Sequence, residues 1–271
     1  MDWKNKVIYQ IYPRSFLDSS GSGTGDLNGI KGKVDYIKSL GVDYVWISPF
    51  FESPQKDFGY DVSNYRKVDK LFGNNDEFKD LVELFHENDI KVIIDLVLSH
   101  TSDEHKWFKE SSKKVKNEYT DWYIWADGEQ NKPPNNWLSV FGGSSWKWVP
   151  KKEQFYLHNF LESQPDLNFH NVAVQNQMLN EIQFWLDFGI DGFRFDVINF
   201  LFHDKGLRNN PYKDASEVRP IGFNKDNPYG LQHHKFDNTQ IDTLMYLEKI
   251  RKLLDKYLSL IHISEPTRPI A

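Results

Sequence analysis

Short apolar runs typical of β-strands alternate with segments of helical periodicity along most of this chain. The clearest run, 91–98 (KVIIDLVL), is apolar almost throughout, which indicates a parallel strand buried on both faces. Such alternation predicts βαβ units with right-handed crossovers, and therefore an α/β fold built around a parallel sheet. The other strands are expected at 7–12, 44–47 and 192–198, and the helices at 30–40, 76–88, 176–188 and 242–257.

Two long segments, 100–171 and 199–241, interrupt this alternation. The first is rich in Trp, Asn, Gly and Pro and is too long for a loop, so we expect a small inserted subdomain there. Both segments follow the carboxyl end of an expected strand, which is the face where barrel enzymes hold their chemistry. The length of 271 residues suits either two ordinary domains or one barrel of about 250 residues.

The composition excludes several classes of function. The chain has no cysteine, which excludes disulfides, a thiol nucleophile and zinc–thiolate sites. A net charge of −6 argues against a nucleic-acid partner. No secretory signal is visible, and no apolar run approaches the ~18 residues of a membrane span. We therefore expect a cytoplasmic protein without a membrane partner. The many aromatic residues (9 Trp, 13 Tyr and 20 Phe) suit both a packed core and platforms for flat rings.

The strand at 192–198 carries the sharpest chemical signal. Its period of two places Arg194 and Asp196 on one face and apolar residues on the other. A buried arginine and carboxylate must be paired, and the guanidinium favours an ionised carboxylate of the kind that acts as a nucleophile. A buried ion pair without a catalytic role is the alternative, and the strand by itself leaves both open.

Further polar residues follow other strands. Asp95 lies within the apolar run at 91–98, and His100 lies just after it. Tyr60 and Asp61, after the second strand, place an aromatic ring next to a carboxylate, although a plain turn would look the same. A lone histidine is usually structural, but carboxyl ends of parallel strands meet at one edge, which favours a shared site. His233 and His234 are expected in a solvated loop.

Over residues 8 to about 257, the chain resembles a known family. It is similar to glycoside hydrolase family 13, the α-amylase family, and within it to the oligo-1,6-glucosidase and α-glucosidase group. The motifs that carry the resemblance are QIYPRSF (10–16), GDLNGI (25–30), GYDVSNY (59–65), DLVLSHTS (95–102), NNWLSVFGG (135–143), QPDLNF (164–169) and GFRFDVINF (192–200).

The resemblance implies the N-terminal half of a TIM (β/α)8 barrel with a subdomain inserted after the third strand. Residues 1–99 would hold strands one to three with two helices, and 100–171 the inserted subdomain. Residues 172–257 would hold the third helix, the fourth strand, a long loop and the fourth helix. The remaining 258–271 resemble a translated sequencing adapter, and we expect a non-native tail there.

The resemblance also implies a retaining glycosidase mechanism, in which a carboxylate forms a glycosyl-enzyme intermediate. Asp196 corresponds to the nucleophile and Arg194 to its charge partner. The residues implied in substrate binding are Tyr60, Asp61, His100, Phe141, Phe160 and the supporting carboxylate Asp95. The family's acid/base glutamate lies beyond the fifth strand and is not found here, so the 271 residues as written are expected to form an inactive fragment.

Two departures from the family pattern concern ligands. The family usually has Asn where this chain has Ser99, which changes one hydrogen-bonding position near the pocket. In the loop 18–26, relatives carry a calcium site, but here Ser20 and Ser22 replace two ligands and leave Asp18 and Asp26. The activity implied requires no cofactor, and the sequence does not decide whether the loop 18–26 binds calcium.

The substrate class implied is a short α-linked gluco-oligosaccharide or disaccharide. Val197, directly after the expected nucleophile, resembles enzymes that prefer α-1,6 bonds, whereas 202–211 resembles a branch that often cleaves α-1,4 bonds or sucrose. A transglucosylase or isomerase of the sucrose isomerase or trehalose synthase type is the alternative within the family. Outside enzymes, the alternatives are an inactive fragment or a non-catalytic binding protein.

Overall fold

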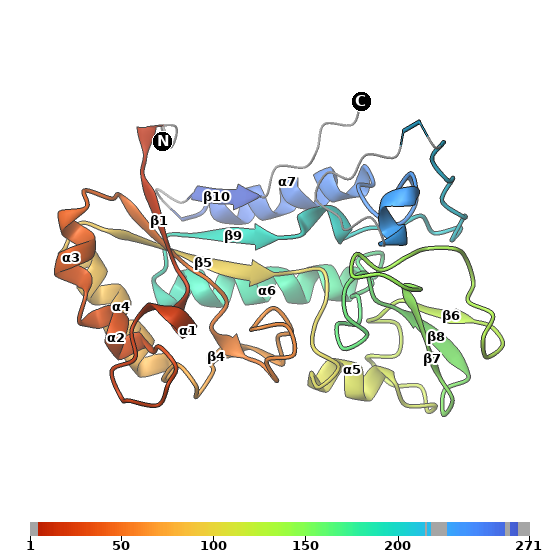
Figure 1. Cartoon of the computed structure of the whole chain (residues 1–271), viewed down its shortest axis with the longest axis horizontal. Helices are drawn as coiled ribbons and strands as arrows, with labels where there is room; N and C mark the ends of the chain where they lie inside the picture. The colour runs from red at the N-terminus through yellow and green to blue at the C-terminus, as the bar shows by residue number, and fades with distance from the viewer. Residues whose placement is uncertain (1–4, 215, 218–226, 258–260, 265–271) are drawn as a thin grey trace. The chain divides into compact units, whose positions relative to one another are not determined.

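The computed structural model describes residues 5–214, 216–217, 227–257 and 261–264. The chain forms two compact units (Figure 1). Unit 1 comprises Met1–Val97, Gln177–Asp196 and Lys249–Pro266, and unit 2 comprises Leu98–Asn176, Val197–Glu248 and Thr267–Ala271.

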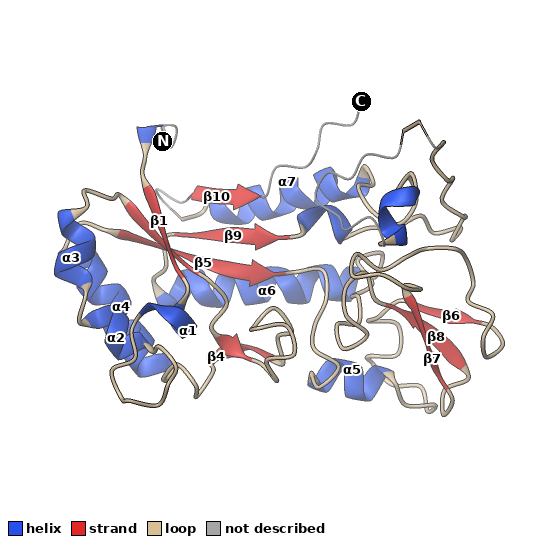
Figure 2. Ribbon diagram, in the orientation of Figure 1, coloured by secondary structure: helices blue, strands red, loops and turns tan. Residues whose placement is uncertain are grey.

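Unit 1 is built on a five-stranded parallel sheet in the order β1-β2-β5-β9-β10. Consecutive strands of this sheet are neighbours, which is the arrangement of a barrel that begins at β1. Figure 2 shows β5, β9 and β10 running side by side in one direction. The strands are β1 (Ile8–Ile11), β2 (Tyr44–Ile47), β5 (Lys91–Val97), β9 (Gly192–Asp196) and β10 (Ile261–Ser264). A separate antiparallel pair is formed by β3 (Phe51–Glu52) and β4 (Asn64–Val68).

The partial barrel predicted from the sequence is confirmed, and the structure carries it one element further than predicted. Residues 261–264 form β10, which pairs with β9 from Ile261 opposite Gly192 to Ser264 opposite Phe195. The physical reason is that the outer edge of β9 presents backbone N–H and C=O groups to any extended segment that reaches it. The rest of the expected tail, 258–260 and 265–271, lies outside the described residues.

The predicted helices are present with shifted boundaries. The segment 30–40 was expected to form one helix but is divided into α2 (Leu27–Lys31) and α3 (Val34–Ser39). The division falls at Gly32 and Lys33, where Lys33 leaves the helical region at φ −119° and ψ 9°. The other helices are α1 (Pro13–Phe16), α4 (Asn75–Glu87), α5 (Lys106–Ser111), α6 (Val172–Phe188) and α7 (Asp242–Leu254).

Local chemistry fixes two of these helix starts. Asn74 and Glu77 form a reciprocal capping box at the start of α4, which satisfies backbone donors that the helix leaves open. Asp26 caps α2 by accepting a hydrogen bond from the backbone of Gly29. Position 29 requires glycine because a Cβ there would lie 2.0 Å from the Leu17 carbonyl oxygen. In Figure 1, α2 and α4 lie side by side.

Aromatic side chains fill the core of unit 1. Trp185 on α6 is fully buried, with ring centroids 5.8, 5.2 and 5.7 Å from those of Phe50, Phe51 and Phe78. Its indole Nε1 donates to the Tyr65 carbonyl oxygen at 2.8 Å, so the one polar atom of the ring is satisfied. Trp185 therefore joins α6 to the segments around β3 and β4.

Unit 2 contains the inserted subdomain, with α5 and a three-stranded antiparallel sheet in the order β6-β8-β7. The strands are β6 (Trp125–Asp127), β7 (Trp146–Val149) and β8 (Gln154–Leu157). Its core consists of Ile124, Ala126, Trp137, Trp146, Phe155 and Leu157. Two 3₁₀ turns follow, Ile198–Phe200 and Pro228–Leu231. Among the described helices of both units, none has the length and apolar character to cross a membrane.

Replacement of Trp185 by alanine is expected to destabilise the protein by about 3–5 kcal/mol, because it opens a cavity in the aromatic core. The free energy of unfolding in urea measures this effect. A loss below about 1 kcal/mol would contradict the assignment of Trp185 as the central core residue.

Candidate active site

The site in unit 1 is built where β5 and β9 lie side by side. The parallel register places Asp95 opposite Arg194, and Asp196 follows at the end of β9. Nη1 of Arg194 donates to Oδ1 and Oδ2 of Asp95 at 2.9 and 3.0 Å, and to Oδ1 of Asp196 at 2.6 Å. One guanidinium therefore bridges two carboxylates, and all three side chains are buried.

Two aromatic residues complete this cluster. Trp46 on β2 donates from Nε1 to Oδ2 of Asp95 at 3.2 Å, and the Arg194 guanidinium lies 5.0 Å from the centre of its ring. Such a cation–π contact stabilises a charge that burial has removed from water. The hydroxyl of Tyr60 lies 3.5 Å from Oδ2 of Asp95. Sequence reasoning missed Trp46. The signal for it was the indole on the strand that neighbours β5.

Burial dominates the electrostatics of the two carboxylates. It raises the pKa of Asp95 to about 7, against the opposing effect of Arg194. Burial also raises the pKa of Asp196, and there too Arg194 opposes the shift. The side chain of Asp95 is 0% exposed and that of Asp196 is 11% exposed, so a proton taken up by the pair goes first to Asp95. This arrangement leaves Asp196 as the ionised carboxylate.

The backbone turns sharply directly after Asp196. Val197 has φ 43° and ψ 41°, in the left-handed region that β-branched residues rarely adopt. Such conformations cost about 1–3 kcal/mol and cluster at functional sites. The strain is therefore a second, independent sign that the end of β9 is a site.

Asp61 has a different environment from the one that its expected sugar contact suggested. Its side chain is fully buried and accepts hydrogen bonds from the Ser53 hydroxyl at 2.9 Å and from the backbone N–H groups of Lys56 and Asp57, both at 3.0 Å. Asp61 thus organises the loop before Tyr60.

A second cluster, in unit 2, gathers three of the predicted pocket residues. The ring of Phe160 lies 5.2 Å from that of His100 and 5.9 Å from that of Phe141. Phe200, which the sequence analysis did not single out, adds a third contact to Phe160 at 5.1 Å. His100 also contacts Gln164, another residue that sequence reasoning missed, with 3.2 Å between the two Nε2 atoms. Its signal was its place in the QPDLNF motif.

The loop 18–26 does not fit a calcium ion in its present form. The Asp18 carboxylate accepts four backbone N–H groups from residues 20–23 at 2.7 to 3.2 Å, and these hydrogen bonds lower its pKa to about 2. The Asp26 carboxylate accepts from the backbone of Ser19 at 3.0 Å and of Gly29 at 2.7 Å. N–H groups thus take the place where a hard cation would need oxygen ligands. In the described part of the chain, no three His, Cys, Asp or Glu residues gather as a metal site.

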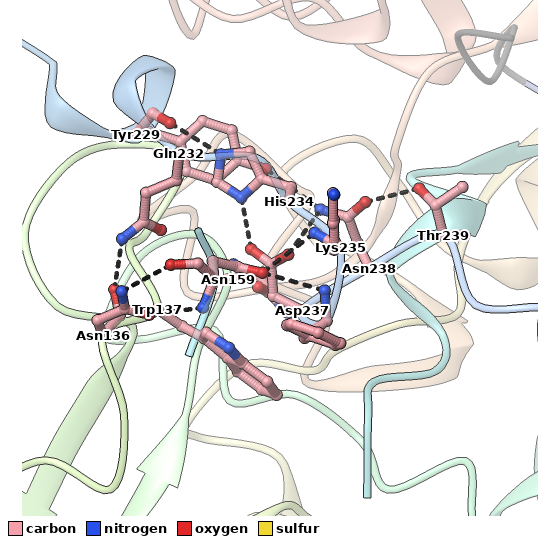
Figure 3. A network of polar contacts seen from close by, with 12 residues as sticks. Asn136, Trp137, Asn159, Tyr229, Gln232, His234, Lys235, Asp237, Asn238 and Thr239 are labelled. Atoms are coloured by element: carbon pink, nitrogen blue, oxygen red, sulfur yellow. Dashed lines mark hydrogen bonds and ion pairs between the residues drawn. The ribbon is translucent and has the colours of Figure 1, made fainter. Parts of the chain in front are cut away.

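The long segment 199–241 is held against the inserted subdomain within unit 2. The Asn136 side chain accepts from the backbone N–H of Asn210 at 2.8 Å and donates to the Asn210 carbonyl oxygen at 2.9 Å. The backbone carbonyl oxygen of Asn136 accepts from the side-chain amide of Gln232 at 2.8 Å (Figure 3). Oδ1 of Asn210 in turn accepts from the backbone N–H groups of Lys235 and Phe236, both at 3.0 Å. The described residues around 210 and 232–236 are therefore bound to the inserted subdomain within unit 2.

The expectation of a solvated histidine pair is wrong for His234. Its Nδ1 lies 2.6 Å from Oδ2 of the buried Asp237, and its Nε2 lies 2.8 Å from the Tyr229 carbonyl oxygen. The ring of Tyr229 stacks on it with a centroid distance of 3.7 Å (Figure 3). These partners lie only three and five residues from His234, but the contacts depend on how the chain turns between 229 and 237, which the sequence pattern did not reveal.

Comparisons with known proteins agree with the fold. The family model described as "Alpha amylase, catalytic domain" matches residues 10–268, and the chain therefore belongs to the α-amylase family. It is 50% identical over 269 residues to the "Probable alpha-glucosidase" of Rhizobium meliloti (strain 1021), covering 97% of this chain and 48% of that protein. It is 47% identical over 234 residues to the oligo-1,6-glucosidase of Bacillus cereus, covering 86% of this chain and 41% of that protein.

A solved structure extends the similarity. The crystal structure of an α-glucosyl transfer enzyme matches with a TM-score of 0.95 and 57% identity, covering 98% of this chain and 50% of that one. The chain thus spans about half the length of the relatives that it matches. The Rhizobium meliloti and Bacillus cereus relatives are named as a probable α-glucosidase and an oligo-1,6-glucosidase.

Replacement of Asp95 by asparagine is expected to change how stability depends on pH. The folded-state pKa of about 7 lies above the unfolded value of about 3.9, so the native state keeps a proton that the unfolded state has lost. Asp95 should therefore make the free energy of unfolding fall as pH rises from about 4 to about 7, and Asp95→Asn should remove this contribution and make the slope less steep. Asp166 and Asp196, whose pKa values burial also raises, keep their own contributions in the variant. Urea unfolding at several pH values measures the slope. The exposed Asp80→Asn should keep the slope, and a slope unchanged in Asp95→Asn would contradict the prediction.

Replacement of Asn136 by alanine is expected to loosen the segment 199–241. It removes two side-chain hydrogen bonds to the backbone of Asn210, worth about 0.5–1.5 kcal/mol each. Amide hydrogen exchange at 210 and 235–236 should become faster. Asn28→Ala, which removes an exposed amide in unit 1, is the control, and equal protection in both variants would show that Asn136 does not hold the segment.

Proposed function

We propose that this chain carries the nucleophile half of a retaining α-glucosidase that acts on short α-linked gluco-oligosaccharides or disaccharides. The observation that carries the proposal is the buried cluster in which Arg194 bridges Asp95 and Asp196 at the end of β9. The family membership supports it, because the relatives include an oligo-1,6-glucosidase. The activity proposed is that of a whole protein about twice the length of this chain.

In this proposal Asp196 attacks the anomeric carbon of the bound sugar. A bond forms between a carboxylate oxygen and that carbon, the glycosidic bond breaks, and the leaving oxygen takes a proton from a general acid. Water then attacks the anomeric carbon of the glycosyl-enzyme and gives a proton to the conjugate base of that general acid, and the released Asp196 returns to its ionised form. Arg194 keeps Asp196 charged and oriented, while Asp95 holds the guanidinium in place through two hydrogen bonds and is the first of the two carboxylates to take up a proton.

Substrate contacts are proposed for each unit by itself. In unit 1, Tyr60 supplies an aromatic platform, and Asp61 supplies a carboxylate in addition to ordering its own loop. In unit 2, His100, Phe141 and Phe160 supply a polar ring edge and apolar walls. Phe141 is 56% exposed, which leaves its ring available to a ligand. The acid/base glutamate is expected beyond the fifth strand, so hydrolysis by residues 1–271 alone is not expected.

Transfer to a sugar acceptor is the second candidate. The specific observation in its favour is the similarity to an α-glucosyl transfer enzyme, at 57% identity. The covalent step is the same in both reactions, and only the nucleophile that opens the intermediate differs. The ratio of free glucose to transfer products, measured with isomaltose, maltose and sucrose, separates the two candidates and ranks the linkages.

Asp196→Asn is expected to lower kcat of the whole enzyme by about 10⁴-fold or more, because an amide cannot form the glycosyl-enzyme. Steady-state hydrolysis of the best of the three disaccharides measures it. The matched control Asp80→Asn removes an exposed carboxylate and should keep wild-type activity. Wild-type turnover in Asp196→Asn would refute the nucleophile assignment.

A further inference from the structure

Gln164 presents its amide NH₂ group, and not its oxygen, to His100. The orientation follows from Leu161, whose backbone N–H donates to Oε1 of Gln164 at 2.9 Å. This hydrogen bond turns the other end of the amide, Nε2, toward Nε2 of His100 at 3.2 Å. Gln164 is 0% exposed and His100 is 1% exposed, so water does not compete for either group.

An amide nitrogen donates hydrogen bonds and cannot accept them. Both the neutral tautomer with its proton on Nε2 and the doubly protonated ring carry an N–H at Nε2. In either state that N–H would point at the amide N–H of Gln164, which is unfavourable. Nε2 must therefore be the unprotonated nitrogen. The remaining ring proton lies on Nδ1, which faces the hydroxyl oxygen of the buried Ser99 at 2.9 Å. The hydroxyl accepts this proton's hydrogen bond.

We infer that Ser99 and Gln164 are positioning residues that hold His100 as the neutral imidazole with its proton on Nδ1. This inference rests on the proposed function for its catalytic meaning. In an α-glucosidase the sugar develops positive charge in an oxocarbenium-like transition state. A neutral His100 adds no opposing charge to the pocket.

The inference also gives Ser99 a role of its own. The short Ser99 side chain already brings its hydroxyl within hydrogen-bonding distance of Nδ1. The departure from the family's usual Asn at this position therefore still leaves the tautomer of His100 fixed. Phe160 adds a ring contact to His100 at 5.2 Å, which limits ring reorientation. The orientation of His100 is thus determined from three sides by residues that themselves perform no bond-making step.

The direct test is NMR of the ¹⁵N-labelled protein, in which long-range ¹H–¹⁵N correlations show which ring nitrogen carries the proton. His100→Asn identifies the His100 signals by their loss. We expect one neutral form of His100 with the proton on Nδ1 at neutral pH. A proton on Nε2, or a doubly protonated ring, would overturn the inference.

Gln164→Glu replaces the amide donor with a carboxylate acceptor of the same shape, so His100 should become doubly protonated. Gln183→Glu adds the same charge at an exposed position of α6 and should leave His100 as in the wild type. If Gln164→Glu does not fold, Gln164→Met removes the donor without adding charge, and both neutral tautomers should then appear. A His100 spectrum unchanged in a folded Gln164 variant would overturn the inference.

Kinetics of the whole enzyme distinguish the inference from the proposed function. Gln164→Glu should lower kcat at least about tenfold, because a charged His100 opposes the charge in the transition state. Unchanged kcat with a doubly protonated His100 would overturn the catalytic consequence. Absence of glycosidase activity together with an Nδ1-protonated His100 would refute the proposed function and leave the tautomer assignment standing.

Discussion

The bridge from Arg194 to Asp95 and Asp196 is the interaction on which the rest of unit 1 depends. A buried carboxylate is stable only when it is paired, and here one guanidinium serves two. This geometry requires β5 and β9 to be neighbours in a single parallel register. It also requires an indole beside the guanidinium, which Trp46 on β2 supplies. The site therefore depends directly on the sheet order, which makes β2, β5 and β9 neighbours.

Unequal burial divides the chemistry between the two carboxylates. Both lose solvation, but Asp95 loses more, and it rather than Asp196 retains a proton toward neutral pH. A site that must attack a carbon needs one ionised carboxylate with its charge held in place. Strand β5 thus supplies the carboxylate that takes up a proton first, Asp95, and β9 supplies the carboxylate proposed to react, Asp196.

In unit 2, hydrogen bonds between neutral groups fix the positions of His100 and of the segment around Asn210. Gln164, Ser99 and Phe160 determine the state of His100, and Asn136 with Asn210 fastens the long segment after β9. Neutral hydrogen bonds suit this purpose because they fix direction without adding charge. The loop 18–26 of unit 1 differs, since its backbone N–H groups hold the charged carboxylate of Asp18. The cluster at the end of β9 is thus held by charged groups, whereas His100 and the segment around Asn210 are held by neutral hydrogen bonds.

The sequence by itself determined what depends on local periodicity. The apolar run at 91–98 predicted β5, and the period of two placed Arg194 and Asp196 on one face, because alternation along a strand is a property of neighbouring residues. It did not predict the break between α2 and α3, the pairing of β10, or the environment of His234. Only the tertiary structure decided those, along with the proton on Asp95 and the tautomer of His100. The pairing of β10, the proton on Asp95 and the tautomer of His100 depend on groups far apart in the chain, such as His100 and Gln164, whose distance and burial exist only once the fold has formed. The break between α2 and α3 and the environment of His234 involve near neighbours, but they depend on turns that periodicity does not describe.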